Sequence, residues 1–254
     1  MKNVLIALAL SAHTLHADVQ LLKSEPTRPA TLNIGYLSLT DDITDFNEVV
    51  KKIKLLAQDS DVAAIILHIN SPGGSPGSSQ IIADFICWAK QLKPIIAFIS
   101  DSGTSGAYWV AAACTHIIAP ESALIGSIGV ASELPTKNKT ISFTAGKFKR
   151  THYLADGVID PEHVDAIQQR IDCLYDIFCN AVAQLRDLDV AVIKGLEAHV
   201  YLGTQALELG LIDQIGTFKD LFEAALELTK TRSTEPVTII RLIESPDEVL
   251  EFTV

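Results

Sequence analysis

Two glycine-containing breaks in the chain hold the residues that could perform nucleophilic chemistry. Ser71-Pro72-Gly73-Gly74 interrupts one apolar run, and Gly103-Thr104-Ser105-Gly106-Ala107 follows the next. Glycines let backbone N–H groups approach a ligand closely, and the start of a helix offers N–H donors without partners inside the helix. Such donors stabilise the anion that forms when a hydroxyl attacks a carbonyl. Ser105, in the first turn of a predicted helix, is therefore a candidate nucleophile beside an oxyanion site.

The segments around these breaks predict alternating strands and helices. Residues 62–69 are almost all apolar, which is typical of a strand buried on both faces of a parallel sheet. A helical pattern follows through Trp88, and residues 95–99 predict a second strand, so the unit is β-α-β. Both breaks then fall at the carboxyl ends of parallel strands, where active sites of open α/β folds lie. We expect the two breaks to be neighbours in space.

The rest of the chain extends this α/β pattern. Further predicted elements are strands at 32–39, 116–119 and 211–215, helices at 41–58, 105–114, 203–210 and 218–230, and a turn at 101–104. The longest is an amphipathic helix over 161–187, whose apolar face must pack against the sheet or a partner subunit.

Composition limits the classes of function. The chain has 254 residues, of which 48% are hydrophobic and 20% charged, as expected of a folded globular protein. Its formal net charge of -11 argues against nucleic acid as a partner, because phosphate binding needs clustered basic residues. The four cysteines lack C-x-x-C spacing and are interpreted as small core residues, and His68 as a core histidine with its hydrogen bonds satisfied. The scattered histidines suggest no metal site.

The first residues have the layout of a secretory signal peptide. A positive start at Met1-Lys2 precedes an apolar run over 4–12 and a small residue, Ala17. A buried first strand is the alternative interpretation. The apolar run is shorter than the roughly 20 residues that a helix needs to span a bilayer.

Five segments, in order along the chain, resemble a known family. They are Asn70-Ser71-Pro72-Gly73-Gly74, Thr104-Ser105-Gly106-Ala107-Tyr108-Trp109, Gly126-Ser127-Ile128-Gly129-Val130, Gly146-Lys147-Phe148-Lys149, and Tyr201-Leu202-Gly203-Thr204-Gln205-Ala206 leading to Gly210-Leu211-Ile212-Asp213. The family is that of the signal peptide peptidases, also called protease IV, which are relatives of ClpP with a crotonase-type fold. The resemblance implies repeated β-α-β units with a parallel sheet and a long packing helix.

The resemblance also implies a mechanism and its residues. Ser105 corresponds to the nucleophile and Lys149 to the base, and the N–H groups of Gly74 and Gly106 correspond to the oxyanion donors. The implied substrate-binding residues are Gly126, Ser127, Ile128 and Gly129. The implied activity is that of a serine endopeptidase that cleaves signal peptides or other unfolded, largely apolar peptides without a cofactor. The implied setting is periplasmic or otherwise extracytoplasmic, with peripheral association to the inner membrane.

The sequence departs from the family pattern near these residues. Thr104 and Ala107 stand where an Ala and a Gly are usual, and the chain between Val130 and Gly146 is shorter than in typical relatives. This shortening leaves open a peptide-binding scaffold of the same fold whose lysine does not reach Ser105.

Other interpretations of the same residues remain. Ser105 could serve only as a helix cap, and Lys147 and Lys149 could be solvated surface lysines. Gly103 to Ala107 is also close to the G-x-S-x-G elbow of α/β-hydrolases, in which Asp189 and His199 would complete a triad.

The resulting domain organisation has four parts. Residues 1–17 are the expected signal peptide, 18–30 a linker, 31–230 the ClpP/crotonase-like peptidase domain and 231–254 a C-terminal extension. Peptides are the expected substrates. Because shorter relatives of this family form rings, we also expect a homo-oligomer, with the helix over 161–186 as its candidate apolar contact surface.

Overall fold

A computed structural model describes residues 30–132, 160–229, 237–245 and 248–253, with only the backbone described in the last two ranges. The expected signal peptide and nearly all of the expected linker lie outside the described residues. In the described part of the chain, no helix is both long and apolar enough to span a membrane.

The elements alternate as an α/β fold requires, which confirms the predicted fold class. In chain order they are β1 (Ala30–Thr40), α1 (Asn47–Gln58), β2 (Ala64–Ser71), α2 (Pro76–Ala89), β3 (Ile95–Thr104), α3 (Gly106–Ala112), β4 (His116–Ala119), β5 (Leu124–Gly126), α4 (Pro161–Arg186), α5 (Val190–Gly195), β6 (Val200–Leu202), α6 (Gly203–Glu208), β7 (Gln214–Ile215), α7 (Phe218–Thr229), β8 (Val237–Ser245) and β9 (Glu248–Thr253).

The strands described here form one mixed sheet. Its main path runs β6-β5-β3-β2-β1-β8-β9, while β4 pairs with β3 and β7. The central pairs β1–β2 and β2–β3 are parallel, whereas the edge pairs β5–β6 and β8–β9 are antiparallel. The segment expected to be a C-terminal extension thus supplies β8 and β9, and β8 adds to the same sheet beside β1.

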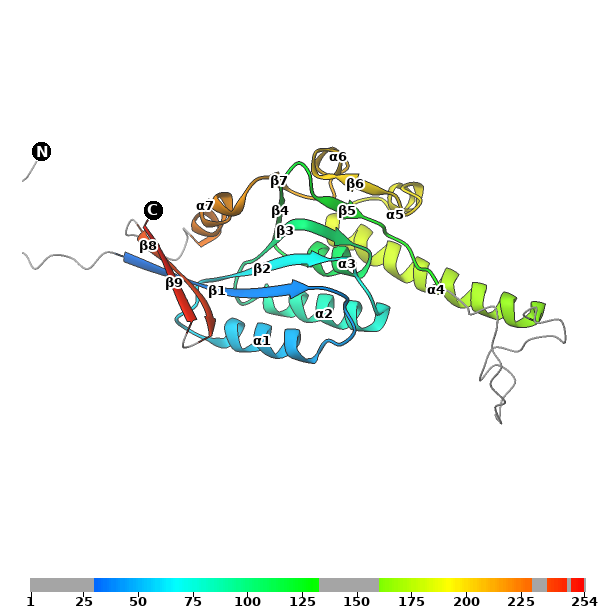
Figure 1. Cartoon of the computed structure of the whole chain (residues 1–254), viewed down its shortest axis with the longest axis horizontal. Coiled ribbons are helices and arrows are strands. Elements are labelled where there is room, and N and C mark those ends of the chain that lie inside the picture. Colours follow the sequence, from blue (N-terminus) through cyan, green and yellow to red (C-terminus); the bar gives the residue numbers. More distant parts are fainter. Residues whose placement is uncertain (1–29, 133–159, 230–236, 246–247, 254) are drawn as a thin grey trace, which may run out of the picture.

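Both faces of the central strands are buried, which explains their unbroken apolar runs. Along β2, Ile65, Leu67 and Ile69 belong to the larger core on the side of α1 to α4, while Ala64 and Ile66 belong to a second core with α7. Figure 1 shows α1 and α2 along one side of the sheet and α7 on the other. Because side chains alternate along a strand, covering both faces requires apolar residues at successive positions.

Several predicted boundaries differ from the structure, such as the strand expected at 211–215, which is limited to β7. Contacts in the fold explain two of the differences. The helix expected from residue 41 begins at Asn47, because Ile43 instead pairs with Gly74 and the Asp45 carboxylate accepts hydrogen bonds from the N–H groups of Phe46 and Asn47. The turn expected at 101–104 is strand, because Ser102 to Thr104 pair with β5. This pairing carries β3 directly to Ser105.

The cysteine prediction is wrong in part. Cys114 and Cys179 are buried, but Cys87 is half-buried and Cys173 is exposed on α4. Burial raises the pKa of the Cys114 thiol to about 12, so this thiol is protonated at neutral pH.

The hydrogen bonds of His68 are satisfied, as predicted. Its two ring nitrogens lie 2.9 Å from the Tyr36 hydroxyl and 2.8 Å from the Ser100 hydroxyl. Burial lowers the pKa of His68.

Candidate active site

Ser105 lies at the junction between β3 and α3 in an unusual backbone conformation. Its φ of 53° and ψ of -129° are rare for a residue with a side chain and cost about 1–3 kcal/mol. The Ser105 N–H donates to the Gly126 carbonyl at 2.8 Å, and its own carbonyl accepts from the N–H groups of Tyr108 and Trp109. These bonds hold the strained turn in place.

The Ser105 hydroxyl does not cap the helix. Ser105 occupies the position before the first residue of α3, but its side chain makes no capping hydrogen bond. By contrast, Ser75 at the start of α2 accepts a hydrogen bond from the Ser78 N–H. The interpretation of Ser105 as only a cap is therefore not supported, and its side chain instead lines a cavity.

The loop after β2 meets the Ser105 turn through glycines, as the two breaks in the sequence predict. A Cβ built on Gly73 would lie 2.6 Å from the Gly106 nitrogen and 2.9 Å from the Ser105 Cβ. A Cβ built on Gly106 would lie 2.2 Å from the Ser79 Oγ and 3.4 Å from the Gly74 nitrogen. Only residues without a side chain permit this approach.

The N–H groups of Gly74 and Gly106 are adjacent donors in this arrangement. Within the described part of the chain, neither makes a backbone hydrogen bond, whereas their neighbours Ile43, Ser75 and Ser105 all do. Gly74 has a φ of 151° and Gly73 a φ of 101°, values that favour glycine. Two free donors beside a hydroxyl are what an oxyanion formed at that hydroxyl would need.

The segment expected to bind substrate lies directly beside Ser105. The Gly126 carbonyl accepts from Ser105, and the Ser127 N–H donates to the His199 carbonyl at 2.9 Å. Ile128 is buried in the core, at 1% exposed, and Gly129 lines the cavity. Of these four residues, Gly129 lines the cavity and Gly126 bonds Ser105, whereas Ser127 bonds His199 and the Ile128 side chain is buried in the core.

The cavity that contains Ser105 has a volume of about 990 Å³ and mainly apolar walls. Ile43 and Pro76 line it on the α1–α2 side, and Val130 lines it near the end of the first described range. Trp109 and Phe178 also line it, with their rings stacked and centroids 4.7 Å apart. This shape and lining suit an apolar side chain.

Most residues that line the cavity are not predicted as site residues from the sequence, and Phe178, Trp109 and Asp42 are examples. Phe178 was predicted only as part of the packing face of the long helix, Trp109 only as part of a matching segment, and Asp42 only as part of a helix. No local signal distinguishes them, since α4 reaches the cavity only through tertiary packing.

The predicted base is outside the described residues. Lys149 and the alternative Lys147 both fall within 133–159. The structure therefore gives no distance from either lysine to Ser105.

The alternative triad is not assembled. The Asp189 carboxylate accepts from the Ala191 N–H at the start of α5, and Nδ1 of His199 lies 3.0 Å from the Leu196 carbonyl oxygen. His199 is exposed and does not line the cavity around Ser105. In a working triad, the Asp would contact the His and the His would contact the Ser.

Metal chemistry has no visible site in the described ranges. Among those residues, no group of three His, Cys, Asp or Glu side chains is arranged to hold a metal ion.

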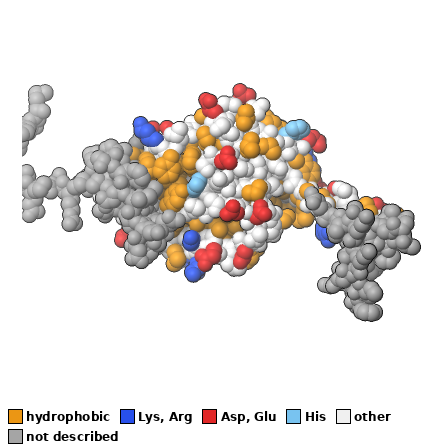
Figure 2. Space-filling model, viewed as in Figure 1, with side chains coloured by type: hydrophobic (Ala, Val, Ile, Leu, Met, Phe, Trp, Pro, Cys, Tyr) orange, Lys and Arg blue, Asp and Glu red, His pale blue; other side chains and the backbone are white. Residues whose placement is uncertain are grey.

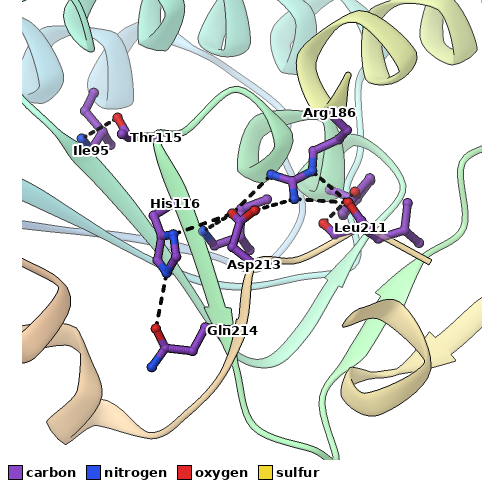
Figure 3. Close-up of polar contacts among 10 residues, drawn as sticks. Ile95, Thr115, His116, Arg186, Leu211, Asp213 and Gln214 are labelled. Atoms are coloured by element: carbon purple, nitrogen blue, oxygen red, sulfur yellow. Dashed lines mark hydrogen bonds and ion pairs between the residues drawn. The ribbon is translucent and has the colours of Figure 1, made fainter. Parts of the chain in front are cut away.

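An ion pair between the largely buried side chain of Arg186 and the partly exposed Asp213 connects α4 to the segment between α6 and β7 (Figure 3). Arg186 donates to both Asp213 oxygens at 2.7 and 3.2 Å and twice to the Gly210 carbonyl. Asp213 also accepts from the Ile117 N–H at 2.8 Å. Burial alone would lower the pKa of Arg186, but the hydrogen bond to Asp213 and the charges of Asp213, Tyr108 and Cys114 together outweigh burial and raise that pKa. This pair fixes the helix that supplies Phe178.

The fold and the strand-to-helix serine place this chain in the ClpP-like class of α/β proteins. A model of Clp protease matches residues 31–141, and a model of peptidase family S49 matches residues 88–232, more than half of the chain. The chain belongs to peptidase family S49, a family of serine-type peptidases. The two matched ranges overlap around Ser105.

Individual relatives agree with this family. The chain is 30% identical over 231 residues to Protease 4 of Haemophilus influenzae, covering 84% of this chain and 36% of that protein. It is 26% identical to the chloroplastic serine protease SPPA of Arabidopsis thaliana, covering 82% of this chain and 32% of that protein. The chain thus spans about one third of the length of these two relatives.

A solved structure shares the fold. It is a serine-to-alanine mutant of the membrane-bound stomatin-specific protease 1510-N, with a TM-score of 0.52 at 16% identity, covering 76% of this chain and 84% of that chain. At this identity the likeness supports the fold alone.

Proposed function

We propose that this protein is a serine endopeptidase with Ser105 as nucleophile and Lys149 as base. The observation that carries the proposal is the arrangement at Ser105: a strained, non-capping serine in a mainly apolar cavity, beside the N–H groups of Gly74 and Gly106. Family membership supports the reaction class, and the match of Gly146 to Lys149 with the family motif supports the choice of lysine.

The proposed reaction proceeds through an acyl-enzyme. Neutral Lys149 takes the proton of the Ser105 hydroxyl as Oγ attacks the peptide carbonyl, and the Gly74 and Gly106 N–H groups bind the resulting oxyanion. Collapse breaks the C–N bond, and the lysine ammonium gives its proton to the leaving amine. Water then attacks the ester with Lys149 as base, which releases the carboxylic acid and regenerates Ser105. A lysine performs this role only if its pKa is lowered towards neutrality.

The proposed substrates are unfolded, largely apolar peptides, including signal peptides. The cavity beside Ser105 is walled by Ile43, Trp109, Val130 and Phe178, which favour an apolar side chain. Ile128 and Gly129 follow the part of the Gly126 to Gly129 segment that already pairs with Ser105 and His199, and they offer backbone along which an extended peptide would add as a strand.

The proposed setting is extracytoplasmic, with the protein at the membrane surface and assembled as a homo-oligomer. The signal-like residues 1–17 and the family resemblance support this location. Exposed apolar residues on α4 support the assembly.

Substitution of the two lysines and Ser105 tests the mechanism. We expect Ser105→Ala and Lys149→Ala each to abolish peptide cleavage, while Lys147→Ala keeps most of it. The two losses should be non-additive in the double variant, because a nucleophile and its base act as one unit. Steady-state kinetics with peptides, together with labelling of Ser105 by a fluorophosphonate, measure both. A dead Lys147→Ala beside an active Lys149→Ala would move the base to Lys147, and activity in both would refute the Ser–Lys mechanism.

A further inference from the structure

Asp42 is placed to select the charge of the peptide. Among the described residues that line the cavity around Ser105, Asp42 is the only one with an ionisable side chain. It is exposed, and in the described part of the chain its carboxylate makes no ion pair. The other lining residues are apolar, glycine or hydroxyl-bearing, so a single negative charge faces a mainly apolar cleft.

The backbone on both sides of Asp42 is pinned, so the charge does not move freely with a surface loop. The Asp41 N–H donates to the Asn70 carbonyl at 3.2 Å, and the Asp41 carbonyl accepts from the buried Ser71 hydroxyl. On the other side, the Ile43 N–H donates to the Gly73 carbonyl and the Ile43 carbonyl accepts from the Ser75 N–H, both at 2.7 Å. Ile43 itself is 2% exposed.

This pinned loop packs directly on the glycines beside Ser105. A Cβ built on Gly74 would lie 2.3 Å from the Ile43 carbonyl oxygen, so the two backbones are in contact. Asp42, the residue before Ile43, therefore sits on the cavity wall next to the proposed oxyanion donor of Gly74. A peptide whose carbonyl lies at Ser105 must pass this wall.

We propose that Asp42 makes the cleft prefer a peptide with a lysine or arginine close to the scissile bond and otherwise apolar side chains. The inference rests on the proposed peptidase function and names the substrate class for the same site. An unpaired carboxylate attracts an ammonium or guanidinium group and repels a carboxylate of the substrate.

A charge-scanning set of peptides tests the proposal. One apolar parent peptide carries Lys, Gln or Glu in turn at each of four positions on either side of the bond that the protein cleaves. For the wild type, we expect one position at which kcat/KM falls in the order Lys, Gln, Glu, with about a three- to tenfold step between Lys and Gln that shrinks in 0.5 M NaCl.

Variants of Asp42 and a matched control test whether the charge preference depends on this residue. Asp42→Asn should bring the Lys and Gln peptides to equal kcat/KM, and Asp42→Lys should make the Glu peptide the best substrate. Glu48→Gln changes the net charge by the same amount at the start of α1 but does not line the cavity, so its preference should match the wild type. A folding defect would slow all three peptides alike.

The outcomes separate this inference from the proposed function. Equal cleavage of the Lys, Gln and Glu peptides by the wild type at every position would overturn the role of Asp42 and leave the peptidase intact. A preference that persists in Asp42→Asn would also overturn it. If the wild type cleaves no peptide in the set, the proposed function fails and the inference falls with it.

Discussion

Ser105 shows how one residue can hold strain that the surrounding structure offsets. Its positive φ is disfavoured for any residue except glycine, and the capping bond that a serine usually makes at this position is absent. The hydrogen bond to Gly126 and the two bonds from α3 stabilise the turn. Strain of this kind is concentrated at functional sites, which is consistent with a nucleophile at Ser105.

Gly73, which contacts the Ser105 turn, allows a prediction about catalysis. A methyl group on Gly73 would fall 2.6 Å from the Gly106 nitrogen, and the φ of 101° disfavours any side chain. We expect Gly73→Ala to lower kcat by about 10²-fold or more, because displacing one oxyanion donor has that effect in serine peptidases.

Gly77 provides the matched control for this substitution. It lies in the same loop-to-helix region, and a Cβ built on it has no neighbour within 4 Å. Gly77→Ala should keep full activity and fold at least as stably as the wild type, because alanine favours a helix. Peptide kinetics and urea unfolding check both variants, and wild-type kcat in a folded Gly73→Ala would count against the oxyanion assignment.

At the scale of elements, α4 is connected to the sheet by both apolar and polar contacts. Phe178 stacks on Trp109 of α3, and Arg186 at the end of the helix pairs with Asp213. A separate bond connects α3 to the segment before β7: the buried Tyr108 hydroxyl donates to the Leu211 carbonyl at 2.7 Å. Burial raises the pKa of this hydroxyl. The packing of the cavity wall therefore depends on a contact between Trp109 and Phe178, which lie far apart in the chain.

Removal of Arg186 should loosen this connection. Its side chain is 9% exposed, and Arg186→Ala would remove the guanidinium donors of the Asp213 carboxylate and the Gly210 carbonyl and leave Asp213 with the Ile117 N–H. We expect the free energy of unfolding to fall by about 2–3 kcal/mol, the range for hydrogen bonds to charged groups. Urea denaturation measures this change.

Lys219 serves as the control for the ion pair. Its contact with Glu223 is a surface pair at 3.9 Å with the lysine 84% exposed, so Lys219→Ala should have no measurable effect on stability. Equal stability of the Arg186→Ala and Lys219→Ala variants would show that the Arg186 pair does not hold α4.

At the scale of the whole molecule, α4 is buried along only part of its length. Phe178, Cys179, Val182 and Ala183 pack in its C-terminal half, while Val164 is 46% exposed near its start. In Figure 1 this first part of α4 extends beyond the sheet. On the face of the molecule that Figure 2 shows, hydrophobic side chains are interspersed with acidic ones. Val164 and Ile177 are large apolar residues exposed on α4, and exposed apolar side chains on a projecting helix favour a subunit contact.

The expected homo-oligomer can be tested on this helix. Val164→Asp should lower the molecular mass measured by light scattering, because a charge would have to be buried in the contact. Val192→Asp on α5 is the control, because Val192 is 47% exposed on a different helix and its substitution should leave the mass unchanged. A wild type that is an active monomer at working concentration would contradict the prediction.

The sequence alone determined the alternation of elements and the two glycine breaks that meet at the site. Apolar runs specify buried strands, and glycines next to a serine specify close backbone approach, because both depend on local residue types. These signals were sufficient to predict the α/β class, the long helix and the contact between the Ser71 to Gly74 loop and Ser105.

Only the tertiary structure decided which distant residues complete the cavity. Phe178 reaches it from α4, Asp42 is held there because Ile43 pairs with the Gly73 to Ser75 loop, and β8 joins the sheet beside β1. The residues next to Phe178, Asp42 or β8 in the sequence do not indicate which distant segment each of them contacts. Their positions follow from the order in which strands pair and helices pack, and that order depends on contacts between segments far apart in the chain.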